Sequence, residues 1–148
     1  MQLLPDDSSI APVIIAGTLS QMSLKLHNQL MLKGYSLLHE DVLQVFINET
    51  CKYAAWQTLT AQRNSTQIIE VDESLVLQGF EWLLIEPSVR AGCDVIQANL
   101  VDASGSLGME HFGLSVSEAE QALKDENQKL GRAAFVQPPL SFKTLAGN

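Results

Sequence analysis

The residue types that most often carry chemistry are few in this chain and lie far apart along it. The histidines, His27, His39 and His111, fall in three different segments, and none has a partner at metal-ligand spacing. His39 and Glu40 begin a zinc-protease helix motif, but Leu43 stands where the second histidine belongs. We therefore expect surface or half-buried histidines, and we predict no metal, no cofactor and no catalytic residue.

The cysteines leave one enzymatic alternative open. Cys51 and Cys93 lie in expected helices and are predicted to be reduced, buried side chains. A Cys–His pair is a spatial arrangement that sequence cannot exclude. An enzyme would need His39, Cys51 and Cys93 to converge in one pocket, and nothing in their spacing favours this.

The composition excludes further classes of function. The chain has 148 residues, a formal net charge of −8 and only nine basic residues, which are scattered singly. This acidic net charge argues against nucleic-acid binding, because phosphate contacts need clustered lysines and arginines. The charged fraction of 18% is below the average of about 25%, which favours surface buried against other subunits. Residues 1–10 have no basic n-region, and no apolar run is long enough for a membrane span, so synthesis inside a cell is expected.

The first helix is expected from an apolar stripe. Ser9 is its predicted cap, Pro12 lies in its first turn, and Gly34 is its predicted terminator. The stripe consists of Ile15, Leu19, Met22, Leu26 and Leu30.

A second helix is expected over residues 37–63, with apolar residues on two faces. One face carries Leu38, Val42, Val45 and Phe46, and the other carries Leu43, Ile47, Cys51 and Ala54. A helix that is apolar on two faces is either central in its fold or shared with a partner. We expect a partner contact here, with Tyr53 and Trp56 as its aromatic residues.

The middle of the chain is expected to contain a short strand and the core helix. Residues 67–71 are rich in β-branched side chains and predict an extended piece, followed by a helix cap at Asp72 or Ser74. In the stretch 79–104, Pro87 is expected at the first position of a new helix. Its predicted features are a Glu86–Arg90 pair and a stripe formed by Val89, Cys93, Ile96, Leu100 and Ala103.

The last helix has the clearest start. Ser115 with Glu118, and Ser117 with Glu120, form overlapping capping boxes. The helix is expected over residues 116–130, with Glu120–Lys124 and Asp125–Lys129 pairs on a solvated face and Gly131 as its end. Glycines at 105, 108 and 113 predict a loop that lacks the pattern of a phosphate cradle.

Together these elements predict a mainly α fold. It is a single domain over residues 1–148, a bundle of four to five helices with a short extended or β segment. An N-terminal arm covers residues 1–10. An extended C-terminal arm covers residues 131–148, where it could pair with the strand near residue 69 or with another subunit.

The second half resembles the head–tail connector (neck or adaptor) proteins of tailed bacteriophages. The resemblance covers about residues 79–145. Its features are the turn at residues 81–87, the helix through Arg90 to Ser104, the loop 108–113, the helix start at 115–118 and the closing stretch 134–138.

The resemblance implies a non-catalytic virion subunit, made in the host cytoplasm. It would assemble with itself into a ring, commonly a dodecamer, between the portal protein and the next neck or tail protein. Genome DNA would pass through the ring without specific binding, and no membrane is involved. The implied anchors on a neighbouring subunit are Phe135, Val136, Pro138, Leu140 and Phe142. The alternative is a small acidic helical module inside the cell, which regulates or binds another protein as a dimer through its second helix.

Overall fold

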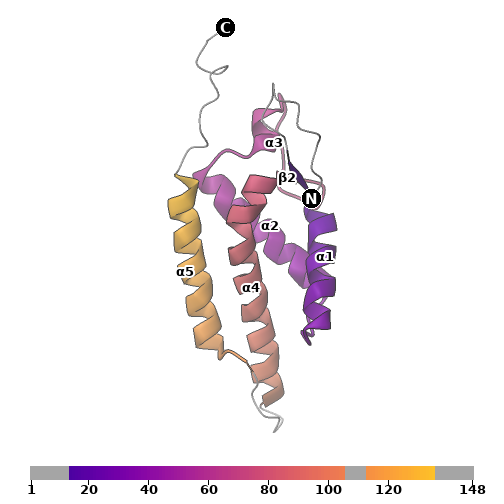
Figure 1. Cartoon of the computed structure of the whole chain (residues 1–148), viewed down its shortest axis with the longest axis vertical. Helices are drawn as coiled ribbons and strands as arrows, with labels where there is room; N and C mark the ends of the chain where they lie inside the picture. Colours follow the sequence, from indigo (N-terminus) through magenta and orange to yellow (C-terminus); the bar gives the residue numbers. More distant parts are fainter. Residues whose placement is uncertain (1–13, 106–112, 136–148) are drawn as a thin grey trace.

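The computed structural model describes residues 14–105 and 113–135. The helices α1, α4 and α5 run roughly along the long axis, α2 crosses them obliquely, and a short helix and a two-stranded sheet lie at one end (Figure 1). The predicted mainly helical class, with a short β segment, is confirmed. In chain order the elements are β1 (Ile15–Thr18), α1 (Leu19–Leu32), α2 (His39–Trp56), α3 (Thr60–Arg63), β2 (Val76–Gln78), α4 (Gly79–Gly105) and α5 (Val116–Ala134).

The start of the first helix differs from the prediction. The helix α1 begins at Leu19, where the Thr18 hydroxyl accepts a hydrogen bond from the amide of Gln21 at 3.2 Å. Gly17, within β1, adopts a φ of 139°, which other residues rarely adopt, next to the irregularity at Ala16. Ile15 therefore belongs to β1 and not to the helical stripe. The expected stop is confirmed, since Gly34 follows the helix with a φ of 89°.

The predicted strand at residues 67–71 is absent, and the strand lies later in the chain. β2 pairs antiparallel with β1 in the register Ile15↔Gln78, Gly17↔Leu77 and Thr18↔Val76, with an irregularity at Ala16. Asp72, expected as a helix cap, instead accepts the amide and hydroxyl of Ser74 in a turn, at 2.8 and 2.6 Å.

The second helix is shorter than predicted. α2 ends at Trp56, because Gln57 is extended, and the chain resumes a single helical turn as α3. Glu81 fixes this break: its fully buried carboxylate accepts the amide and hydroxyl of Thr60 at 2.7 and 2.9 Å, and the amide of Gln78 at 2.8 Å. One acid thus joins the start of α3 to the start of α4.

Pro87 does not begin a helix, as was predicted, but lies inside α4. A proline at this position removes the hydrogen bond to the carbonyl of Leu83. Both residues are exposed, so the missing bond lies on the solvent side, while Ile85 and Val89 are fully buried and hold the two halves of the helix on the core. The predicted ion pair within α4 is confirmed, with Arg90 Nη2 at 2.7 Å from Glu86 Oε1.

The last helix starts as predicted and ends later. The Ser115 hydroxyl accepts from the Glu118 amide at 3.3 Å, and the Glu118 carboxylate accepts from the Ser115 amide at 2.9 Å. Gly131, the expected terminator, lies inside α5, because residues 132–134 continue the helix with good helix formers. Lys129 pairs with Glu126, at 2.7 Å, rather than in the expected bridge to Asp125.

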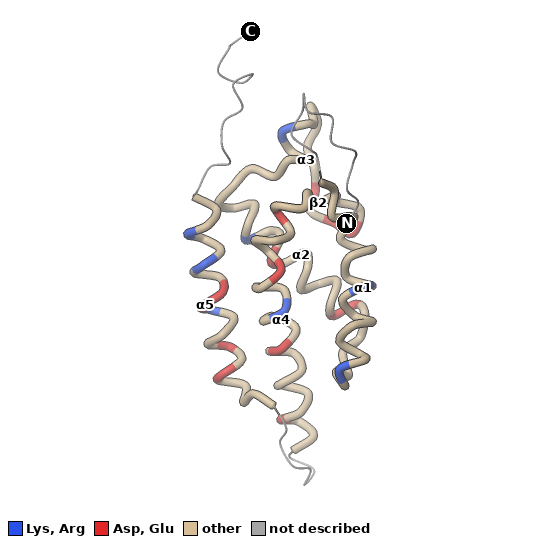
Figure 2. The backbone as a smooth tube through the Cα atoms, in the orientation of Figure 1, with Lys and Arg blue, Asp and Glu red and all other residues tan. Residues whose placement is uncertain are grey.

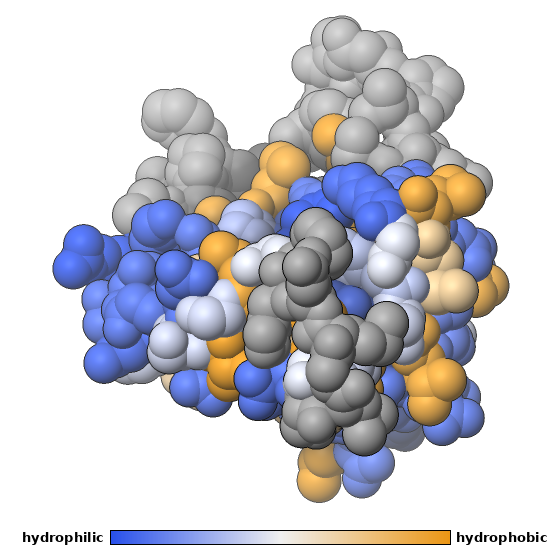
Figure 3. Space-filling model, turned by 90° about the horizontal axis from the view of Figure 1, so that it is seen from below, coloured by the Kyte–Doolittle hydropathy of each residue, from blue (hydrophilic) through white to orange (hydrophobic). Residues whose placement is uncertain are grey.

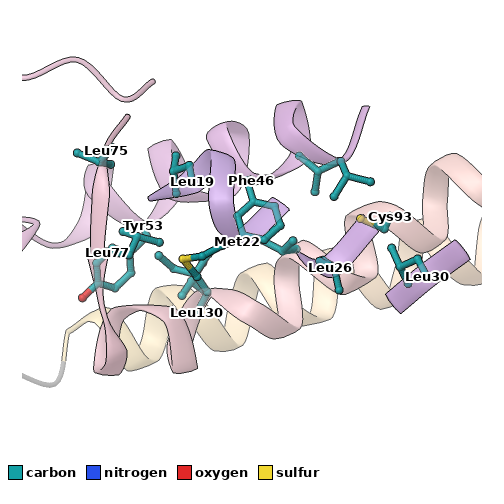
Figure 4. Packing of buried hydrophobic residues seen from close by; sticks show 14 of the residues in the cluster. Leu19, Met22, Leu26, Leu30, Phe46, Tyr53, Leu75, Leu77, Cys93 and Leu130 are labelled. Carbon is teal, nitrogen blue, oxygen red and sulfur yellow. The ribbon is translucent and has the colours of Figure 1, made fainter. Parts of the chain in front are cut away.

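All four long helices contribute to one hydrophobic core. α2 contacts α1, α4 and α5, so it is central in the bundle, while the expected partner contact on its second face stays a prediction. The buried side chains form a row along the bundle, from Leu75 and Leu77 at the sheet end to Leu30 and Cys93 (Figure 4). Among the described helices, none is both long and apolar enough to cross a membrane.

Candidate interaction surface

The structure brings two of the histidines together, which their sequence positions did not indicate. The rings of His27 and His39 lie edge to face with centroids 5.8 Å apart. His39 Nε2 is 3.1 Å from the hydroxyl of Ser23, and His27 Nε2 is 2.9 Å from the carbonyl of Leu37. Ser23 is fully buried, so its hydroxyl is closed to a substrate, and the cluster fastens α1 to the start of α2.

The two cysteines differ in their exposure to solvent. Cys93 is fully buried, and burial raises the pKa of its thiol to about 12. Cys51 is exposed on α2, which corrects the prediction that both are buried. His39 lies twelve residues before Cys51 on the same helix, which separates them by about 18 Å. The convergence required for a Cys51–His39 pair is therefore absent.

An aromatic pair marks one end of the bundle. Trp56, the last residue of α2, and Phe135, directly after α5, pack edge to face with ring centroids 5.4 Å apart. Trp56 is 55% exposed and Phe135 is 68% exposed. Gly131 lies beneath the indole, where an added Cβ would be 3.9 Å from Trp56 Cε2. Two large aromatic side chains are thus held in contact while remaining open to solvent.

A predominantly apolar groove of about 560 Å³ runs beside this pair. We call it the Trp56–Phe135 groove; its lining includes Trp56, Lys124, Leu130, Gly131, Arg132 and Phe135. The charged positions of α5 are acidic at its start, Glu118 and Glu120, and basic at its end, Lys129 and Arg132, with both signs between them (Figure 2). The groove therefore combines an apolar floor with basic residues.

A buried acid stabilises one wall of the groove. Glu49 is 3% exposed and its carboxylate contacts Lys52 Nζ at 2.6 Å. With its amide nitrogen turned toward the acid, Asn127 of α5 donates to Glu49 Oε2 at 2.7 Å. Burial raises the pKa of Glu49, an effect that the nearby Lys52 ammonium opposes. This cluster joins α2 to α5 and engages Lys52, which also lines the groove.

The structure places the predicted interface residues in different environments. Trp56 and Phe135 meet on the surface, although Phe135 was expected in an extended arm and instead has helical backbone angles. Tyr53, which was predicted to contact a partner, is 1% exposed and belongs to the core. Tyr53 lies one turn before Trp56, only about 60° away around α2, but it packs within the core, whereas Trp56 is the last residue of the helix. Val136, Pro138, Leu140 and Phe142 lie outside the described residues.

Sequence reasoning missed Lys124, Leu130 and Arg132 as neighbours of this pair. The helix was expected to end at Gly131, which left Arg132 and Phe135 in an arm. The signal that could have extended it is the spacing of Leu123, Leu130 and Ala134, which continues the helical pattern past the glycine.

Other exposed apolar residues are spread over the molecule. Phe80 and Leu83 are exposed in the first turns of α4, at the end that carries Trp56. Leu32 and Leu38 are exposed where α1 leads into α2. In the view from below, hydrophobic residues appear in separate patches among hydrophilic ones (Figure 3). The Trp56–Phe135 groove differs from these patches because it combines an aromatic pair with a hollow.

No family model, curated protein or solved structure matches this chain. Within the described residues, no three His, Cys, Asp or Glu side chains are arranged to hold a metal ion. The candidate site is the Trp56–Phe135 groove, whose apolar lining and exposed aromatic pair suit protein contacts.

Proposed function

We propose that this chain is a structural, non-catalytic subunit of a tailed-phage virion. In this role it is a head–tail connector that forms a ring, commonly a dodecamer, between the portal and the next neck or tail protein. The observation that carries the proposal is the exposed aromatic pair Trp56 and Phe135 beside an apolar groove. The resemblance of residues 79–145 to connector proteins supplies the biological setting.

The exposed aromatic pair favours burial against another protein. Fully burying one large apolar side chain contributes about 1.5–3 kcal/mol. Trp and Phe are enriched at the centres of protein interfaces, where they fill pockets on the partner. Both residues are more than half exposed in the single chain, so most of this gain is available to an assembly.

The charge of the chain supports a position around a DNA channel. The formal net charge is −8, and the two basic residues near the end of α5, Lys129 and Arg132, do not make a broad patch. Such a surface repels phosphate groups, so a passing genome would not adhere to it. The proposed partners are therefore other copies of this chain, the portal protein and the next neck or tail protein.

Complementation of a phage that lacks this gene tests the proposal. We expect mass spectrometry to detect the wild-type chain in purified particles, in a fixed ratio to the portal protein. A Trp56→Ser/Phe135→Ser variant should be lost from them. Leu32→Ser is the matched control, because Leu32 is 90% exposed at a site away from the groove and its replacement should leave incorporation unchanged.

The alternative module makes the opposite prediction for localisation. A wild-type chain found in the infected cytoplasm but absent from purified particles would refute the connector and favour an intracellular binding module.

A further inference from the structure

The Trp56–Phe135 groove has an unusual charge for this protein. The whole chain is acidic, with 17 acidic and nine basic residues. Three of those nine, Lys52, Lys124 and Arg132, line this one groove. Its floor is apolar and contains Leu130 beside the aromatic pair. A ligand that matches both properties would be an acidic segment with large apolar side chains.

Two of the three basic residues are free to meet such a ligand. Lys52 is engaged by Glu49 at 2.6 Å, and Lys129, outside the groove, is engaged by Glu126. Within the described residues, no carboxylate forms an ion pair with Lys124 or Arg132. The helix dipole favours a cation near the end of α5, but it does not account for the apolar hollow between these side chains.

The chain itself contains a segment of the required chemistry. Residues 1–13, MQLLPDDSSIAPV, carry Asp6 and Asp7, no basic residue, and the large apolar residues Leu3 and Leu4. Residues 136–148, VQPPLSFKTLAGN, carry Lys143 and no acid, so their charge has the same sign as the groove. Charge complementarity therefore selects the first segment over the second.

We propose that the Trp56–Phe135 groove binds residues 1–13 of an adjacent copy. Leu3 and Leu4 cover the aromatic pair, and Asp6 and Asp7 meet Lys124 and Arg132. A segment of one copy inserted into a different surface of the next is a heterologous contact, which generates rings when the rotation closes. Thirteen extended residues span up to about 43 Å, enough to cross to a neighbour. This inference rests on the proposed ring and specifies the contact between its neighbouring copies.

Peptide binding tests the contact without requiring a ring. A fluorescent peptide of residues 1–13 is titrated into the full chain carrying Asp6→Lys/Asp7→Lys, whose own segment no longer matches its groove. We expect saturable binding that weakens about tenfold when Lys124→Ala/Arg132→Ala is added, because two attractive pairs are lost and the lysines of the chain's own segment gain no new partner. Lys33→Ala/Lys129→Ala is the control with the same change of charge outside the groove, and it should retain binding.

A mixing experiment tests whether the contact joins two copies. Asp6→Lys/Asp7→Lys and Lys124→Glu/Arg132→Glu should each lower the mass of the assembly, measured by light scattering. An equimolar mixture should restore it, because each reversed segment then meets a reversed groove on another copy. Recovery in a chain carrying all four substitutions but not in the mixture would mean that the segment binds its own groove, and would overturn the proposal.

The outcomes separate this contact from the proposed function. Rings that form while the peptide of residues 1–13 does not bind would refute the contact and leave the connector standing. Peptide binding by a chain that is absent from virions would leave the groove's specificity intact and refute the connector. Binding of the peptide of residues 136–148 instead would show that the charge argument is wrong.

Discussion

At the scale of single residues, buried carboxylates determine how the helices begin and meet. Glu81 is fully buried, yet its two oxygens accept three hydrogen bonds, from Thr60 and Gln78. Glu49 is almost as buried but is held by a lysine and an amide. A buried acid with several donors stabilises its surroundings, whereas removing it leaves those donors without partners.

Replacement of Glu81 by alanine should be among the most destabilising changes at this end of the molecule. It leaves the backbone amides of Thr60 and Gln78 without an acceptor, so we expect a loss of about 2–4 kcal/mol in the free energy of unfolding. Urea unfolding followed by circular dichroism measures this. Glu86→Ala is the control, because the half-buried Glu86–Arg90 pair lies at the surface of one helix and contributes about 1 kcal/mol at most. Equal losses in the two variants would contradict the structural role of Glu81.

Glu49 should give the folded protein a pH dependence that opposes the usual one for carboxylates. Burial raises its pKa in the folded state above that in the unfolded state. Between those two values the folded state binds more protons, so this group's contribution to stability falls as pH rises and is greatest below the unfolded pKa.

Glu49→Gln should therefore flatten the stability profile above the ordinary glutamate pKa of about 4.3. At neutral pH the free energy of unfolding of the Glu49→Gln variant should be between 0 and about 1 kcal/mol higher than that of the wild type. The reason is that burying an amide costs less free energy than burying a carboxylate. Thermal unfolding at several pH values, with Glu86→Gln as control, measures both effects. A large loss of stability at neutral pH, with an unchanged profile, would show that the Lys52 interaction dominates instead.

At the scale of elements, the sequence predicts those helix boundaries that neighbouring residues determine. The Ser115–Glu118 box places the start of α5 correctly, and Gly34 places the end of α1. The sheet could not be predicted in this way, because Thr18 and Val76 pair across most of the first half of the chain. Pro87 was misplaced because tertiary packing around Ile85 and Val89 keeps α4 continuous through a residue that disfavours it.

Two helical glycines should respond in opposite directions to alanine. At Gly92 an added Cβ would lie 2.7 Å from Val45 Cγ1, so Gly92→Ala should force α2 and α4 apart and cost about 1–3 kcal/mol. At Gly131 the nearest contact would be an ordinary 3.9 Å to the Trp56 ring, so Gly131→Ala should gain up to about 1 kcal/mol from helix propensity. Chemical unfolding of both variants measures the difference, and a stabilised Gly92→Ala chain would contradict the close approach of these helices.

At the scale of the whole molecule, the bundle carries an aromatic groove at one end. The two-faced second helix predicts Trp56 as an interface residue, and the resemblance implies Phe135; the structure brings these two side chains into contact. The sequence could not separate them from Tyr53, which lies one turn before Trp56 but is buried in the core formed with the other elements. Nor could it place Lys124 and Arg132 at the groove, because that requires the full length of α5 packed beside α2.

The mass of the assembled chain tests the central claim most directly. Light scattering of the purified wild-type chain, alone and with the portal protein, should give a closed ring, and Trp56→Ser/Phe135→Ser should give single folded protomers with a nearly unchanged melting temperature. The control Leu32→Ser should still form the ring. A wild-type chain that stays a single protomer in both conditions, or rings that persist without the two aromatic residues, would contradict the account.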